Sequence, residues 1–289
     1  MRGGVMLARY KTKSFLKSII FRYIDDEITA MGSQLAYSLL LAFFPFLILL
    51  MTLVGYSSVK SEDVIAALGT ILPIDVLKLV KNTVVEVVDT RRSGLLSISM
   101  VSTVWTASNG FNAVIRGLNK AYDEKEKRPY WKVQLTAILC TIGLVLIIIV
   151  AFALLVFGEI GVKFLISRFH VTPRVEYIID FSRYIIGLTV MIIVFNAVYR
   201  YTPSKRLTWG ETLPGAVFTT IGWTLISVGF SYYVNNFGSY SRIYGSLGAV
   251  IALMSWLFIS SVIILIGGEI NATLAYRKLD LEKHKGAKY

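Results

Sequence analysis

Cysteine and histidine are scarce in this sequence, and their scarcity excludes several kinds of site. Among 289 residues there is one cysteine, Cys140, and there are two histidines, His170 and His284. A single cysteine cannot form an intramolecular disulfide or a cysteine-based metal site, and two histidines so far apart do not make a histidine-rich metal motif. We therefore expect no metal and no cofactor.

Charged residues are also few, at 17% of the chain, whereas soluble domains carry about 25%. In their place, 55% of the residues are hydrophobic and the mean hydropathy is +0.64. These apolar residues form long runs, and a helix of about 20 residues crosses the roughly 30 Å hydrocarbon core of a bilayer. The sequence predicts an all-α fold: a polytopic membrane helix bundle of six transmembrane helices with amphipathic interfacial helices.

The intervals without charge locate the predicted spans. A basic segment with an interfacial helix is expected at 1–32, a transmembrane domain at 33–276 and a basic tail at 277–289. Within that domain the spans are expected at about 33–56, 93–115, 133–158, 178–199, 212–234 and 246–276.

Lysine and arginine are distributed unequally between the two sets of loops. The N-terminal segment, 116–132, 200–206 and the C-terminal tail together carry 20 of them, and the opposite loops carry 10. Because the more basic loops of membrane proteins stay in the cytoplasm, we expect a multi-pass protein of the bacterial cytoplasmic (inner) membrane with both termini cytoplasmic. The net charge of +12 then reports topology, and we expect no nucleic-acid partner, since no basic soluble module is present.

Three segments outside the spans show apolar residues at helical spacing. Residues 15–31 are expected to form an interfacial helix with the apolar stripe Phe15, Ile19, Tyr23, Ile24, Ile28 and Met31. A second stripe runs Val76, Leu79, Val80, Val84, Val87 and Val88, and a third short one covers 160–169. Packing against the bundle is the preferred interpretation, and a gate or lid is the alternative.

Short motifs follow one another along most of the chain, from about residue 30 to 275. They are QLAY (34–37) with Pro45, WTASNGF (105–111), NKAY (119–122), YRYTP (199–203), LPGA (213–216), Tyr240, YGSLG (244–248), Trp256 and GGEIN (267–271). Taken in order, they resemble the YihY/BrkB family of bacterial inner-membrane proteins, historically labelled ribonuclease BN. The resemblance implies a six-helix inner-membrane protein and carries no settled activity.

Residues for hydrolytic chemistry are not grouped in this sequence. Cleaving RNA requires a general acid and base, or carboxylates and histidines that hold metal ions. No paired carboxylate motif, Ser–His–Asp order or phosphate-binding loop is found. We expect that the protein is not an enzyme and has no catalytic residues, and a membrane-associated ribonuclease is the least favoured interpretation.

Polar residues and glycines within the predicted spans are the candidates for a substrate pathway. Polar side chains inside lipid usually face protein or water, and glycines let helices approach closely or leave a groove. Interhelical hydrogen bonding and tight packing are the alternative explanation. The pathway candidates are Gln34, Tyr37, Ser102, Trp105, Asn109, Asn112, Arg116, Gly215, Gly222, Gly229, Glu269 and Asn271.

Glu269 is expected to form an ion pair with Arg116, Arg200 or Arg206, which belong to loops on the same side. The leading functional hypothesis is transport or flipping of a lipid-like amphipathic substrate, without a nucleotide site, with membrane lipids as partners. The alternative is a non-transporting scaffold for envelope proteins. No pattern in the sequence specifies an oligomeric state.

Overall fold

The computed structural model describes residues 15–55, 61–69, 93–147, 173–237 and 247–286, and a few positions between 77 and 85. Across these ranges the elements are helices, with no strand among them, and the predicted all-α class is confirmed. The predicted segment at 160–169 and the second half of the span at 133–158 lie outside the described residues.

The long helices lie in the segments where spans are expected, and the bounds of the spans stay a prediction. Five of the described helices are long and apolar enough to cross a membrane, which is consistent with the predicted six spans. Among the long helices, α6 has 29 residues but is not one of these five. The long helices are α3 (Ile28–Gly55), α6 (Ser93–Ala121), Tyr130–Ile147, α8 (Pro173–Tyr201), α9 (Trp209–Phe237) and α11 (Leu247–Gly286).

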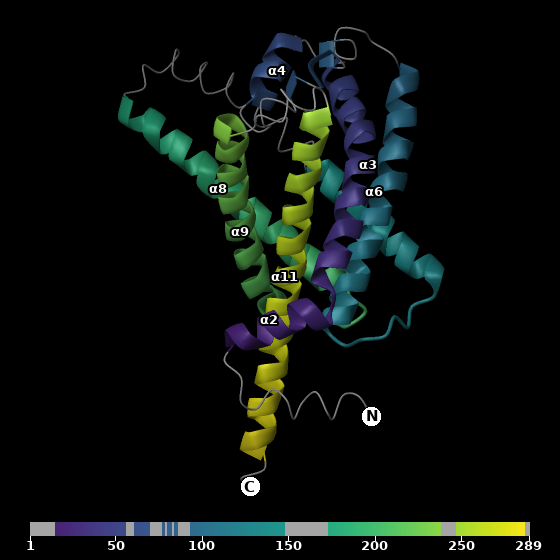
Figure 1. Ribbon diagram of the computed structural model, residues 1–289, viewed down its shortest axis with the longest axis vertical. Helices are drawn as coiled ribbons and strands as arrows, with labels where there is room; N and C mark the ends of the chain where they lie inside the picture. The colour runs from purple at the N-terminus through teal and green to yellow at the C-terminus, as the bar shows by residue number, and fades with distance from the viewer. Residues whose placement is uncertain are drawn as a thin grey trace.

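The helix α11 lies in the middle of the bundle and contacts α9 on one side and α3 and α6 on the other (Figure 1). The pair α3 and α6 pack along each other, while α8 crosses the bundle obliquely and packs on α9. The short helix α4 (Ser61–Gly69) lies at the opposite end of the bundle from α2 (Phe15–Asp25). There it packs against the buried residues Val80 and Val84 of the predicted second stripe, whose other members, Val76, Leu79, Val87 and Val88, lie outside the described residues.

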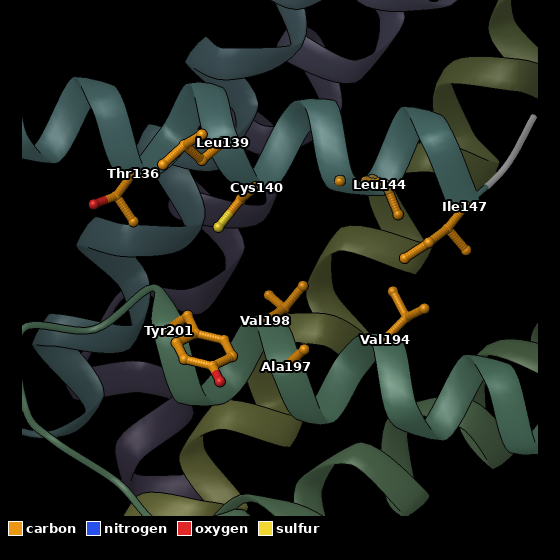
Figure 2. A pocket seen from close by; sticks show the side chains of 10 residues that line it. Thr136, Leu139, Cys140, Leu144, Ile147, Val194, Ala197, Val198 and Tyr201 are labelled. Atoms are coloured by element: carbon orange, nitrogen blue, oxygen red, sulfur yellow. The ribbon is translucent and has the colours of Figure 1, made fainter.

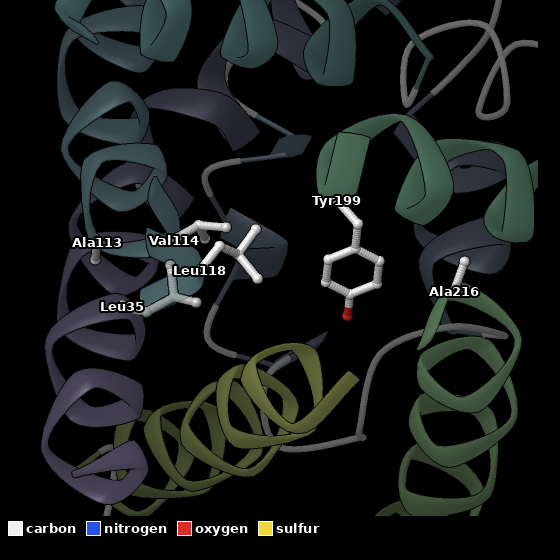
Figure 3. Packing of buried hydrophobic residues seen from close by; sticks show 6 residues of the cluster. All are labelled: Leu35, Ala113, Val114, Leu118, Tyr199 and Ala216. Atoms are coloured by element: carbon white, nitrogen blue, oxygen red, sulfur yellow. The ribbon is translucent and has the colours of Figure 1, made fainter. Parts of the chain in front are cut away.

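A central apolar cluster joins five helices. Leu35 of α3, Val114 and Leu118 of α6, Tyr199 of α8 and Ala216 of α9 are all buried in it (Figure 3). Ile264 of α11 packs against the same cluster. The Tyr199 hydroxyl donates a hydrogen bond to the Ile264 carbonyl at 2.6 Å and shares another with Thr219 at 2.6 Å. Tyr199 therefore links α8, α9 and α11 by packing and by hydrogen bonds.

The seam between α9 and α11 is built from glycine. A Cβ on Gly215 would collide with the carbonyl oxygen of Gly267 and with the amide of Asn271. The Asn271 side chain accepts a hydrogen bond from the Gly215 backbone N–H at 2.6 Å and donates one to the Thr212 carbonyl at 3.0 Å. Close backbone approach and interhelical hydrogen bonds are the interactions that hold helices together in lipid. At Gly215 the glycine serves packing.

The three predicted pathway glycines of α9 differ in their surroundings. Gly222 faces Ile263 of α11, whereas a Cβ on Gly229 would meet nothing within 4 Å.

A methyl group at Gly215 has no room between α9 and α11. We therefore expect Gly215→Ala to separate the two helices and to lower the free energy of unfolding by about 1–3 kcal/mol, the usual effect of overpacking.

Gly229→Ala is the matched control, because it adds the same methyl group to the same helix. Thermal unfolding in detergent should show a lower midpoint for Gly215→Ala and an unchanged or higher midpoint for Gly229→Ala. Equal midpoints for the two variants would contradict the close seam.

The helix predicted at residues 15–31 is wrong in its extent. The structure ends α2 at Asp25 and begins α3 at Ile28, with Glu27 between them at a φ of 54°. The fully buried residues of α2 are Ser18 and Arg22, while Phe15, Ile19 and Tyr23 of the predicted stripe are half-buried and Ile24 is 72% exposed. A polar contact with the bundle, which spacing of apolar residues does not reveal, decides how α2 lies.

Candidate functional site

One end of the bundle, which we call the basic end, contains α2 and the two connections 122–129 and 202–208. The connection after α6 begins with a hydrogen-bonded turn in which Glu124 N–H donates to the Asn119 carbonyl and Asp123 N–H donates to the Lys120 carbonyl. Asp123 has a φ of 52°, and this combination is the Schellman motif that ends many helices. The turn directs the chain across the basic end.

A polar network joins the two connections. Arg128 donates to both Glu126 carboxylate oxygens, at 2.9 and 2.8 Å, and to the Thr202 carbonyl at 2.9 Å. Asn119 donates to Glu126 at 2.8 Å and accepts from the Ser204 N–H at 2.7 Å. The network therefore holds the start of the Tyr130–Ile147 helix beside the end of α8.

The charge of Glu126 is fixed by this network. Hydrogen bonds from the Arg128 side chain lower the pKa of Glu126 to about 2, against the effect of partial burial. Because this pKa is lower in the folded state, ionised Glu126 stabilises the fold at pH values above its unfolded pKa of 4.5. That stabilisation is lost only as the pH falls toward 2. The network is therefore intact throughout the physiological pH range.

An apolar groove lies between the Tyr130–Ile147 helix and α8. It has a volume of about 440 Å³ and is lined by side chains of both helices. Thr136 and Tyr201 stand at one end, and Ile147 and Val194 stand at the other (Figure 2). Leu139 and Tyr201 in its walls are 59% and 55% exposed, so the groove opens to the outside of the bundle.

Aromatic and basic side chains surround the end of the groove at Tyr201. The Arg200 guanidinium lies 5.4 Å from the Tyr201 ring and 4.9 Å from the Trp209 ring. On the other wall, Thr136 donates a hydrogen bond to the Lys132 carbonyl, one turn nearer the basic end. Tyrosine, tryptophan and arginine in this arrangement are typical of the headgroup level of a membrane.

A buried ionic cluster lies on the other side of the basic end. Arg22 of α2 is 3% exposed and donates to the Glu269 carboxylate at 3.0 Å and to the Ala121 carbonyl at 2.6 Å. The Tyr276 ring lies 5.1 Å from the same guanidinium. Glu269 is 1% exposed and Asp26 is 7% exposed. Arg22 thus joins α2 to the end of α6 and to α11.

The family model described as "Virulence factor BrkB" matches residues 19–289. The chain belongs to the BrkB family. It is 42% identical over 266 residues to YfkH of Bacillus subtilis (strain 168), whose name calls it ribonuclease-like, with 92% of this chain and 96% of YfkH covered.

More distant relatives carry only the name UPF0761 membrane protein. That of Aliivibrio salmonicida (strain LFI1238) is 26% identical, with 90% of this chain and 82% of the relative covered. No solved structure matches. These relatives identify a membrane protein family, and the family model that matches is not described as catalytic.

The predicted partner of Glu269 in this BrkB-family protein is wrong. None of Arg116, Arg200 and Arg206 pairs with it, and Arg22 does. Arg116 is exposed on α6, and Arg200 faces aromatic rings. Arg22 and Glu269 are 247 residues apart in the sequence, so no local sequence pattern indicates that they pair.

The predicted pathway residues are distributed over several surfaces. Five are exposed on the outside of α3 and α6: Gln34, Tyr37, Trp105, Asn109 and Arg116. Ser102 and Asn112 are half-buried, and Asn112 donates to Gln134 of the next helix at 2.8 Å. Gly215, Glu269 and Asn271 are buried in contacts within the protein, and Gly229 is exposed. None of the predicted residues lines the groove, so their contact with a substrate stays a prediction.

The groove was missed because its walls have ordinary apolar side chains. Valine, leucine and isoleucine on a span look alike in sequence whether they face lipid, a neighbouring helix or a groove. Two residues of the lining stand out in the sequence: Cys140, the single cysteine of the chain, and Gly143, whose Cβ direction is open space. Within the described ranges, no group of three or more histidine, cysteine or acidic side chains is placed to hold a metal ion.

Removing only the cation of the buried cluster should destabilise the fold. We expect Arg22→Met to lower the free energy of unfolding by about 3–5 kcal/mol, because it leaves the Glu269 carboxylate buried without its cation. The double variant Arg22→Met/Glu269→Met should recover most of the loss.

Lys17→Met is the control on the same helix, because Lys17 is exposed. Thermal unfolding of the purified variants measures the effect. If Arg22→Met unfolds at the same temperature as Lys17→Met, the ion pair does not hold α2 to the bundle.

Proposed function

We propose that this BrkB-family membrane protein binds a lipid-like amphipathic molecule in the groove between the Tyr130–Ile147 helix and α8 and moves it between leaflets. The observation that carries the proposal is an open apolar groove of about 440 Å³ between two helices that are both apolar enough to span a membrane. Cavities of this size are typical of small-molecule sites.

The surroundings of the groove favour an acyl chain as its occupant. At membrane depth the open side of the groove faces hydrocarbon, and an empty groove would leave its walls without dispersion contacts. Water is a poor alternative occupant, because a water molecule requires two to four polar partners. Leu139, Leu144 and Val198 supply none, and Thr136 and Tyr201 supply hydroxyl groups at one end only.

The same end of the groove favours a headgroup that carries negative charge. Lys132 and Arg200 lie one on each wall near this end, and exposed aromatic rings accompany both. Basic residues beside a membrane surface attract anionic lipids by about 1 kcal/mol each. By the bias of lysine and arginine among the loops, we place the basic end at the cytoplasmic face of the inner membrane.

Blocking the groove should abolish lipid movement. Gly143→Phe places a ring in the groove, and its control is Gly187→Phe on α8, because a Cβ at either position meets nothing within 4 Å and Gly187 does not line the groove. In liposomes with a labelled phospholipid, we expect the wild type and Gly187→Phe to equilibrate the label between leaflets. Gly143→Phe should match protein-free vesicles.

Binding can be measured separately from transport. Cys140 is the chain's single cysteine and lines the groove, so a phospholipid with a thiol-reactive group along its acyl chain should label it. Gly143→Phe should block the labelling, while Gly187→Phe should not. Labelling without any label movement would reject transport and retain binding, and unhindered labelling of Gly143→Phe would reject the groove as the binding site.

A further inference from the structure

The cluster at the basic end contains more buried negative charge than positive charge. Asp26 and Glu269 are each less than a tenth exposed, and Arg22 is the buried cation between α2 and α11. With both carboxyl groups ionised, these three side chains carry a net charge of −1. Burial of an uncompensated charge is unfavourable by several kcal/mol, so the cluster favours a state with one proton added.

The hydrogen bonds of Glu269 show where a proton fits. Its Oε2 atom accepts from Arg22, whereas its Oε1 atom is buried and receives no hydrogen bond from any described residue. Asp26 lies one helical turn after Arg22, with its backbone N–H donating to the Arg22 carbonyl at 2.8 Å, and its buried carboxyl group interacts with that of Glu269. Two carboxylates cannot hydrogen-bond to each other, but a carboxylic acid donates to a carboxylate. We infer that Asp26 and Glu269 form a proton-binding site, in which one proton bridges the two carboxyl groups while Arg22 binds Glu269 from the other side.

Charged and titratable groups from each neighbouring element surround this site. Asp123 lies 4.0 Å from Arg22 and is 40% exposed, so solvent screens it. Lys120 pairs with the exposed Glu27 at 2.9 Å. The others are Asp25 on α2, Tyr122 after α6, Tyr276 on α11, and Lys205, whose ammonium lies over the Tyr122 and Tyr276 rings.

Proton binding should control how firmly α2 is held. Burial raises the pKa of Asp26 from 3.8 to about 6, and Arg22 only partly opposes this rise. An acid whose pKa is higher in the docked state binds its proton more tightly there, so docking is strongest at low pH and weakens as the pH rises through 6. Raising the pH from about 5 to about 8 should therefore weaken α2 docking.

Infrared difference spectroscopy of the full chain in lipid nanodiscs tests the proton directly. Exposed carboxyl groups are ionised above about pH 5. Between about pH 5 and about pH 8, we expect the wild type to lose the carbonyl stretch of one protonated carboxylic acid. Glu269→Gln should lack this band, since its amide can donate to Asp26 and accept from Arg22 without a proton. Asp26→Asn should lack it as well, and Glu126→Gln should keep it.

Hydrogen exchange of the α2 amides, corrected for the intrinsic pH dependence of exchange, gives a second readout. The wild type should lose protection of the α2 amides between about pH 5 and about pH 8, whereas Glu269→Gln should show no such change. A wild-type spectrum without the carboxylic acid band, or one identical to that of Glu269→Gln, overturns the proposal. Neither measurement involves lipid movement, so the outcome is independent of the proposed transport.

Discussion

The close approach of α9 to α11 at Gly215 and Gly267 is the contact on which the other helix positions depend. Because neither residue has a side chain, the two backbones approach closely enough for Asn271 to bond the first turns of α9. The same approach places Tyr199 where it reaches Thr219 and the Ile264 carbonyl. In lipid, packing and hydrogen bonds replace the hydrophobic effect between helices. The position of α8, and with it one wall of the groove, follows from this seam.

Polar side chains on α11 give the bundle its specificity. Glu269 and Asn271 are two residues apart, so they point in different directions from the helix, toward Arg22 and toward α9. A buried polar group that loses its partner is penalised by its full desolvation, which makes a shifted packing of α2 or α9 unfavourable. Apolar contacts alone tolerate sliding of one helix along another. These two residues therefore fix the register that leucine and isoleucine leave open.

The sequence was sufficient for the helices, because a long apolar run can satisfy its backbone in lipid only as a helix. It also identified Gly215, Glu269 and Asn271 as unusual residues, although not their partners. Arg22 was grouped with the basic N-terminal residues, since charge alone does not distinguish a cation facing solvent from one inserted into a bundle. Gly143 and Cys140 are the residues of the groove that stand out in the sequence, and neither indicates a groove. Its shape depends on how the network of Glu126 and Arg128 holds two helix ends together, and such distant contacts have no sequence period.

The groove and the proton-binding site share the end of α6. Ala121, the last residue of α6, gives its carbonyl to Arg22. Asn119, half a turn earlier, holds Glu126 and thereby Arg128, which bonds the Thr202 carbonyl at the end of α8. A chain of contacts does not by itself couple two sites. Coupling requires an element with two states whose equilibrium is shifted by binding at each site. Here α2 is the element whose docking responds to the proton. Arg22 and Asn119 both bond from or to the last turn of α6, so the two sites share this helix end.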